Sequence, residues 1–334
     1  MRRAIGMRSR TLATRIASQT MTSVEMRKAS EPDKDKGYLL VTPARNEARN
    51  LADVADSIVT QTLLPSAWVI VDDGSTDGTA MVIGELQRKR KWIISTRLPQ
   101  QRRDLHLHYA LVCKAGFDLG IRYLDAQQVG YEFLGLVEAD TIVEPRFFEK
   151  LIAEFEKDSR LGLASGGVFY RRKGRLVLER TDKKSPRGTG RLWKKSCFFE
   201  TGGYTASYAP PDVVSNAKAK LLSYRVNQFQ SIVAVQTRDT SSEEGLWVGY
   251  AMKGRSWHYI NAHPLLILMN VIHFSSQSPR SRGMAFFLGY FTAFLQRQTK
   301  IEDEELRRYF WRDRPIEVIE SAFGKEPSRG ATQE

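Results

Sequence analysis

The sequence has little cysteine and no long apolar run. Its 334 residues include two cysteines, Cys113 and Cys197, and no Cys-x-x-Cys pair. A disulfide framework is therefore excluded, and a reducing compartment is the default expectation. The longest uncharged apolar stretches, 262–278 and 283–296, are shorter than the roughly 20 apolar residues that span a bilayer. We expect these stretches to form helices that are buried, lie in a dimer contact or lie on a membrane surface.

Basic residues outnumber acidic ones. Lys and Arg total 51 against 38 Asp and Glu, a formal charge of +13, which favours nucleic acid, a phosphate-bearing substrate or an anionic membrane face as partner. Residues 1–30 are rich in Arg, Ser and Thr and lack the apolar core of a secretory signal. We interpret residues 1–36 as a disordered basic tail, with a mitochondrial presequence as the alternative. A second basic segment, 171–195, is either a solvated face or a contact for an acceptor or a membrane.

Apolar runs and helical periods alternate between residues 37 and 170. The continuous apolar runs at 38–41, 67–71 and 133–137 are typical of buried parallel strands, and amphipathic stretches separate them. This alternation predicts an α/β fold with a mostly parallel, Rossmann-like sheet flanked by helices. The chain from residue 241 onward reads as helices, so we also expect a C-terminal helical extension.

Polar residues follow three of the predicted strands at the points where these strands end. They are Pro43, Asn46 and Glu47 after the run at 38–41, Asp72 and Asp73 after the run at 67–71, and Glu138 and Asp140 after the run at 133–137. Parallel sheets bind ligands outside the carboxyl ends of their strands. Clustered carboxylates repel one another unless a cation lies among them, and such oxygen-rich sites suit Mg²⁺ or Mn²⁺. In a basic chain this predicts a diphosphate substrate, although single acids here could also form turns or cap helices.

Three segments, VTPARNEARNL, VDDGSTDGT and VEADTIVEP, resemble in order and spacing the family 2 glycosyltransferases of GT-A fold. The Gly-Gly-Tyr at 202–204 and the stretch from Asp212 to residue 226 agree in type, so the resemblance covers about residues 37–263. It implies an inverting, metal-dependent enzyme that moves a sugar from a nucleotide diphosphate, UDP more than GDP, to a glycan or lipid-linked acceptor. It implies a donor-binding half over 37–170 and an acceptor half over 171–262 of one GT-A domain. Composition and periodicity add the basic tail over 1–36 and the C-terminal helices over 263–334.

The resemblance also assigns roles to residues. The donor's base and ribose would contact Pro43, Asn46, Glu47, Asp72, Asp73 and Glu138. Asp140 would ligate Mn²⁺ or Mg²⁺, and Glu138 stands where the family usually has Asp. Asp212 would be the base that deprotonates the acceptor hydroxyl, although it could equally cap the helix that follows. Further candidates for the diphosphate or the acceptor are Lys114, Arg191, Arg238 and Arg255.

Three alternatives stay open at this point. The first is transfer to a polyprenyl phosphate, which is already ionised and needs no base. The second is a sugar nucleotidyltransferase, although the loop after the first strand, PARNEARN, lacks the glycines that hold a triphosphate. The third is a basic nucleic-acid-binding protein, for which no binding motif is found, so we expect no nucleic acid as partner. We expect the protein in the cytoplasm, peripheral on the inner membrane face.

Overall fold

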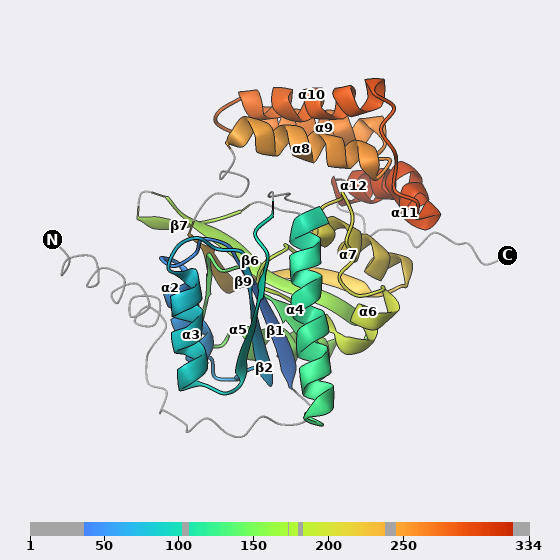
Figure 1. Cartoon of the computed structure of the whole chain (residues 1–334). Coiled ribbons are helices and arrows are strands. Elements are labelled where there is room, and N and C mark those ends of the chain that lie inside the picture. The colour runs from blue at the N-terminus through green and yellow to red at the C-terminus, as the bar shows by residue number, and fades with distance from the viewer. Residues whose placement is uncertain (1–36, 102–106, 173, 180–182, 238–244, 323–334) are drawn as a thin grey trace. The chain divides into compact units, whose positions relative to one another are not determined.

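The structure is a computed structural model that describes residues 37–101, 107–172, 174–179, 183–237 and 245–322 (Figure 1). These residues form two compact units. The α/β unit contains the described residues of 37–206 and 222–237, and the helical unit contains 207–221 and 245–322. The boundaries predicted at residues 170 and 262 concern function and stay predictions. The predicted tail over 1–36 lies outside the described residues.

The α/β unit holds one sheet and the helices that pack on it. The strands are β1 (Tyr38–Ala44), β2 (Ala67–Asp73), β3 (Ile93–Leu98), β4 (Phe133–Leu136), β5 (Thr141–Val143), β6 (Leu161–Arg172), β7 (Arg175–Leu178), β8 (Arg191–Lys194) and β9 (Arg225–Gln236). The helices are α2 (Leu51–Val59), α3 (Thr79–Lys89), α4 (Leu107–Ala126), α5 (Phe147–Lys157) and α6 (Lys195–Glu200).

The strand order is β3-β2-β1-β4-β8-β6-β9-β5, with β7 paired to β6. The first four strands are parallel, and their register pairs Ala44 with Asp72 and Val41 with Leu136. The carboxyl ends of β1, β2 and β4 therefore meet at one edge, as the sequence predicts. Beyond β4 the sheet is mixed, because β8 is antiparallel to both neighbours while β6 and β9 are parallel.

The sheet is buried on both faces because alternate residues of each strand meet different helices. Leu40 and Ile70 pack in one core cluster with residues of α2, α3 and α5. Leu39 and Val69 face the other way, where α4 approaches so closely that a Cβ on Gly120 would overlap both side chains. This period of two explains why the strands read as continuous apolar runs.

Some element boundaries differ from the sequence prediction. The sequence pattern of 47–61 predicts a helix with Asn46 as its N-cap. Asn46 has φ +57°, in the left-handed region, and helix α2 begins only at Leu51. Its cap residue is Asn50, so the prediction of Asn46 as N-cap was wrong. The short strands β5, β7 and β8 were not predicted, since three or four residues carry too little periodic signal.

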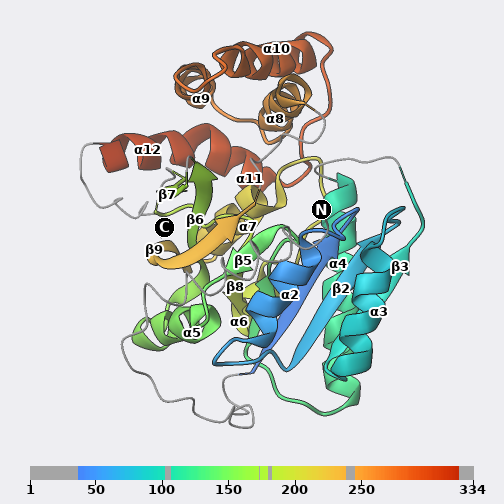
Figure 2. The same cartoon turned by 90° about the vertical axis from the view of Figure 1, so that its left-hand side faces the viewer.

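The helical unit has its own core. Its helices are α7 (Pro211–Leu221), α8 (Leu246–Tyr259), α9 (Pro264–Ser275), α10 (Ser281–Leu295), α11 (Glu304–Arg308), the π-helical turn η1 (Tyr309–Asp313) and α12 (Arg314–Ala322). Helix α10 packs on both α8 and α9 (Figure 2). A Cβ on Gly289 would overlap the carbonyl oxygen of Ala251 in α8, so the two backbones are in direct contact. Within the described residues, no helix has the length and apolarity needed to cross a bilayer.

Candidate active site

The loops that follow β1 and β2 are bonded to one another at the carboxyl edge of the sheet. The backbone N–H of Asn46 donates to Oγ of Ser75 at 3.0 Å, and the N–H of Thr76 donates to Oδ1 of Asn46 at 2.8 Å. The N–H of Glu47 donates to Oγ1 of Thr79 at 2.8 Å. These cross-links join the two predicted donor-binding segments, and Asn46, in the left-handed region, lies in the loop after β1.

Asp72 is a buried acid with a structural task. Its Oδ1 accepts the backbone N–H of Ser75 at 2.9 Å, which closes the turn after β2. Its Oδ2 lies 3.5 Å from Nη1 of Arg97, and the same guanidinium donates to the carbonyl of Ser75 at 2.8 Å. The alternative that Asp72 forms a turn therefore holds for its Oδ1, whereas its Oδ2 faces Arg97.

Asp73 is held by two side chains of basic type. Its Oδ2 lies 3.2 Å from Nη1 of Arg45, and its Oδ1 lies 2.8 Å from Nε2 of His108 in the first turn of α4. Arg45 also donates to the carbonyl of Gln101 at 2.8 Å. Each oxygen of Asp73 keeps a second lone pair, so the carboxylate can still accept a hydrogen bond from a ligand hydroxyl.

Glu138 and Asp140 are joined by one amide. Nε2 of Gln236, the last residue of β9, donates to Oε2 of Glu138 at 3.2 Å and to Oδ1 of Asp140 at 3.4 Å. The hydroxyl of Tyr109 donates to the other oxygen of Glu138 at 2.9 Å, and Tyr170 bonds to Oε1 of Gln236 at 3.1 Å. The shared N–H group reduces the repulsion between the two carboxylates and keeps them side by side.

The start of α4 connects the two groups of acids. His108 contacts Asp73, and its neighbour Tyr109 contacts Glu138. Desolvation raises the pKa of Tyr109 well above 10, and the nearby charge of Glu138 acts in the same direction, so the hydroxyl stays a donor. Burial likewise raises the pKa of the Cys113 thiol one turn later, which disfavours the reactive thiolate form. The sequence prediction of an acid-rich edge after three strands is confirmed in the arrangement of its residues.

The sequence profile of Glycosyl transferase family 2 matches residues 39–209, just over half of the chain. This range begins in β1 and encloses all three strand-end segments. The protein is a member of glycosyl transferase family 2. The resemblance read from the sequence is therefore confirmed, and the α/β class of GT-A type with C-terminal helices is confirmed with it.

Among curated relatives of this family 2 glycosyltransferase is the poly-beta-1,6-N-acetyl-D-glucosamine synthase of Staphylococcus aureus strain COL. It is 20% identical over 234 residues, which cover 64% of this chain and 53% of that protein. The enzyme of the same name from Staphylococcus epidermidis is 22% identical over 217 residues, covering 59% and 49%. The chain thus spans about half the length of the curated relatives it matches.

Solved glycosyltransferase structures are also similar to this chain. S. aureus TarS in complex with UDP-GlcNAc is 12% identical, with 81% of this chain and 78% of that chain covered and a TM-score of 0.48. The mannosyltransferase PcManGT from Pyrobaculum calidifontis, in complex with GDP-Man and Mn²⁺, is 14% identical. It covers 96% of this chain and 84% of its own, also with a TM-score of 0.48.

The strand-end acids are the candidate ligands of the divalent cation that the sequence predicts. Within the residues that the structure describes, no three His, Cys, Asp or Glu side chains gather as a complete metal site. Glu138 and Asp140 offer two adjacent carboxylates, joined by Gln236. Mg²⁺ is commonly held by one or two carboxylates together with the phosphates of its substrate. The donor set therefore fits an ion whose coordination a diphosphate completes.

Four predicted cations have different surroundings. Arg191 is fully buried in β8, and its guanidinium lies 4.3 Å from the ring of Trp193. Lys114 forms an ion pair with Asp118 one turn along α4 at 2.6 Å. Arg255 is exposed on α8 in the helical unit, and Arg238 lies outside the described residues.

Asp212 belongs to the helical unit and not to the unit that holds the other acids. Helix α7 begins at Pro211, so Asp212 lies inside the first turn and the alternative that it precedes and caps this helix was wrong. An acid in the first turn is favoured by the helix dipole. Its assignment as the base stays a prediction from the resemblance.

Sequence reasoning missed four residues that shape the site. Arg45 lies inside the recognised segment after β1 and could have been included from its position alone. His108 and Tyr109 open α4, outside the three segments that carry the family resemblance. Gln236 carries no local signal, because it reaches Asp140 only through the pairing of β5 with β9, which sets Thr141 opposite it.

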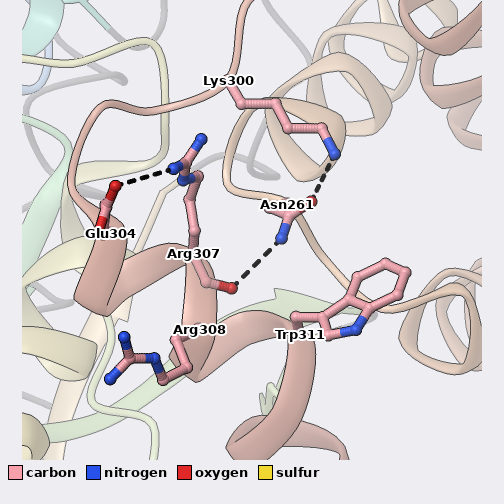
Figure 3. A pocket seen from close by; sticks show the side chains of 6 residues that line it. All are labelled: Asn261, Lys300, Glu304, Arg307, Arg308 and Trp311. Atoms are coloured by element: carbon pink, nitrogen blue, oxygen red, sulfur yellow. Dashed lines mark hydrogen bonds and ion pairs between the residues drawn. The ribbon is translucent and has the colours of Figure 1, made fainter.

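A separate pocket of about 380 Å³ lies in the helical unit (Figure 3). Its lining residues are Asn261, Lys300, Glu304, Arg307, Arg308 and Trp311. Nζ of Lys300 donates to Oδ1 of Asn261 at 2.5 Å, and Arg307 is paired with Glu304 at 3.6 Å. Two of its three cations are thus already engaged, and none of the predicted site residues lines it.

Proposed function

We propose that this protein is a metal-dependent inverting glycosyltransferase that moves a sugar from a nucleotide-diphosphate donor, UDP before GDP, to a glycan or lipid-linked acceptor. The observation that carries the proposal is the convergence of three strand ends at one edge. There Asp73 is held by Arg45 and His108, and Glu138 and Asp140 share the amide of Gln236. Membership of family 2 supports the reaction class. The curated relatives make N-acetylglucosamine a sensible first sugar to test.

We assign the donor's nucleoside to the cross-linked loops after β1 and β2. Asp73 is suited to accept from the ribose because both its oxygens are fixed in place and each keeps a free lone pair. Pro43, Asn46 and Glu47 would line the base, while Asp72 supports the turn beneath it. Glu138 would reach the ribose from the other side, held by Tyr109.

Asp140 would ligate Mn²⁺ or Mg²⁺, with Glu138 beside it. Such an ion, when bound, stabilises the charge that develops on the diphosphate as it leaves. Gln236 keeps both carboxylates together and Tyr109 stays protonated as a donor, so the chain itself fixes where the charge of the two acids lies. Lys114, Arg191, Arg238 and Arg255 are lesser candidates for contacts with the diphosphate or the acceptor.

Asp212 would take the proton from the acceptor hydroxyl as that oxygen attacks C1 of the sugar. The new C1–O bond forms while the bond from C1 to the diphosphate oxygen breaks, and this single displacement inverts the anomeric centre. A polyprenyl phosphate acceptor would need no base. Replacing Asp212 with Asn should abolish transfer to a hydroxyl and leave nucleotide binding intact. Full activity of that variant would support the polyprenyl phosphate alternative.

The first test is isothermal titration of UDP and GDP, with and without Mn²⁺, on wild type and Asp140→Ala. We expect one nucleotide to bind only with the metal, and the substitution to abolish this binding. Binding of neither nucleotide to the folded protein would overturn the proposal. A lipid-linked acceptor would bring the enzyme to an anionic membrane face, and the basic net charge of the chain supports an anionic membrane as a partner.

A further inference from the structure

Helix α10 is apolar on two opposite faces. The inner face is buried against α8 and α9 through Ala285, Phe286, Gly289 and Ala293. The outer face, here called the outer stripe, consists of Met284, Phe287, Leu288, Phe291, Phe294 and Leu295. These six side chains are 41–63% exposed within the described part of the chain. Their spacing of three and four residues sets them along one side of the helix, so they form one continuous apolar surface.

Helix α9 adds exposed apolar residues next to this helix. Leu268, Met269 and Ile272 are 38–61% exposed. The two helices touch where a Cβ on Gly283 of α10 would overlap Ser275 and the carbonyl of Val271. Scattered exposed apolar side chains are ordinary, but a run of this size on packed helices marks a surface that binds something.

The charges in the stretch of chain that forms α8, α9 and α10 have one sign. Residues 245–301 contain no Asp or Glu. Their Lys and Arg residues are Lys253, Arg255, Arg280, Arg282, Arg297 and Lys300. Arg280 directly precedes α10 and Arg297 follows its end, and both are exposed. The stripe therefore has a cation at each end, and an apolar helix face with basic flanks is the pattern of helices that lie in the interface of an anionic bilayer.

We propose that the outer stripe of α10, with the exposed residues of α9, docks this protein on an anionic lipid surface. The helix would lie along the bilayer, with its phenylalanines in the acyl boundary and Arg280 and Arg297 at the headgroups. Its 15 residues are too few to span the hydrocarbon layer. The purpose of docking, bringing a lipid-linked acceptor within reach, rests on the proposed function, but lipid binding itself does not require transfer.

Two other occupants fit the charges less well. A second copy joined through the same face would bring cations against cations, with no acid in 245–301 to pair with them. The chain's own segment 1–36 has nine Lys and Arg against four Asp and Glu, so it has the same sign as the rim. The net charge of both is positive, whereas an anionic lipid surface supplies a net negative charge.

The test is flotation of the full chain with vesicles of pure phosphatidylcholine and of phosphatidylcholine containing one-third phosphatidylglycerol. We expect wild type to float with the anionic vesicles. The Phe287→Gln/Phe291→Gln variant should bind them at least about tenfold more weakly, because each phenylalanine buries apolar area on docking. Met81→Gln is the control, since Met81 is 72% exposed on α3 of the α/β unit and should not matter.

A second variant tests the charge. Arg280→Gln/Arg297→Gln should weaken binding to the anionic vesicles about 25-fold, since each cation near such a surface contributes roughly a factor of five. Binding to pure phosphatidylcholine should not change. Nucleotide titration on both variants should match wild type, because the donor site lies in the α/β unit. Failure of that site would therefore be distinguishable from failure of docking.

Three results would overturn the proposal. If the wild-type protein does not float with the anionic vesicles, the docking proposal is wrong. A concentration-dependent dimer in sedimentation, lost in the phenylalanine variant and unaccompanied by vesicle binding, would assign the face to a second copy. A thermal midpoint several degrees lower in that variant, again without vesicle binding, would assign it to a segment of the same chain. Because the replaced side chains are exposed, docking predicts an unchanged midpoint.

Discussion

The two units of this protein distribute charge in opposite ways. In the α/β unit the acids at the carboxyl edge are largely buried, and Asp72, Asp73 and Asp140 each contact at least one donor. In the helical unit, residues 245–301 have no acid at all, and the outer stripe of α10 is exposed beside arginines.

This difference indicates two kinds of partner. Burying several carboxylates side by side lowers the stability of the fold unless a ligand compensates their charge. The α/β edge therefore suits a ligand with hydroxyl groups and a divalent cation. An exposed apolar stripe with basic residues at both ends suits a partner that is both apolar and negatively charged. Substitutions can test the α/β unit and the helical unit separately. Four of them follow, from the largest expected effect to the smallest.

The largest effect is expected from Asp140→Asn, which removes the charge of the proposed metal ligand. We expect kcat/KM for sugar transfer to fall by about 1,000-fold or more, because the developing diphosphate charge would lose its ion. Thermal stability should stay close to wild type. Glu149→Gln is the control, since Glu149 is a surface acid that pairs with Arg146 on the same unit. If Asp140→Asn kept transfer within tenfold, the edge would not be the metal site.

The next effect concerns packing in the helical unit. Gly289→Ala places a Cβ against the carbonyl of Ala251 and must push α8 and α10 apart. We expect the free energy of unfolding to fall by about 3 kcal/mol, the upper end of the range for overpacking. Gly84→Ala in α3, where a Cβ would meet nothing within 4 Å, should instead gain up to about 1 kcal/mol from helix propensity. Denaturant titration of both variants checks this, and equal stabilities would contradict the close contact.

Much of the α/β unit could be predicted from the sequence, because local patterns determine it. Continuous apolar runs give the parallel strands, and their ends give the acids. What could not be predicted depends on pairing between distant segments. Arg191 looks like part of a basic surface segment, yet it is fully buried in β8, where antiparallel pairing sets it opposite Leu136. Counting charges along the sequence cannot predict its contact with the Trp193 ring.

The candidate site shows the same division. The motif acids were found from the sequence, whereas their partners Gln236 and His108 were not, because each reaches its acid across a long stretch of chain. The helical unit is harder still. Both faces of α10 are apolar, so periodicity alone cannot say which is inside, and only the packing of Gly289 on α8 decides it.

A third prediction concerns the acid network that holds α7 to α12. Glu317 accepts from Nζ of Lys220 at 2.7 Å, from Arg314 at 2.8 Å and from the hydroxyl of Tyr309 at 3.0 Å. Glu317→Gln removes the charge and leaves two cations facing a neutral amide. We expect a loss of about 2 kcal/mol in unfolding free energy at neutral pH, less than for a fully buried pair.

The same network gives a pH dependence. Burial alone would raise the pKa of Glu317, but the charges of Lys220 and Arg314 hold it below its ordinary 4.5. A depressed folded pKa contributes stability that is present above the unfolded value and is lost as pH falls through the folded value. Wild type should therefore lose stability below about pH 4.5, and Glu317→Gln should lose less over the same interval. Parallel acid titrations of the two proteins would refute this.

The smallest effect is expected from Tyr109→Phe, which removes the hydroxyl that holds Glu138. We expect KM for the donor to rise about fivefold, the equivalent of one hydrogen bond, with kcat nearly unchanged. Tyr224→Phe is the control, because its hydroxyl makes the same kind of bond to Glu200 on the exterior. Since desolvation raises the pKa of Tyr109 well above 10, the hydroxyl should donate at every pH at which the enzyme is assayed. The ratio of the two KM values should thus be flat with pH, and a ratio that falls toward one below pH 10 would mean that Tyr109 does not hold this acid.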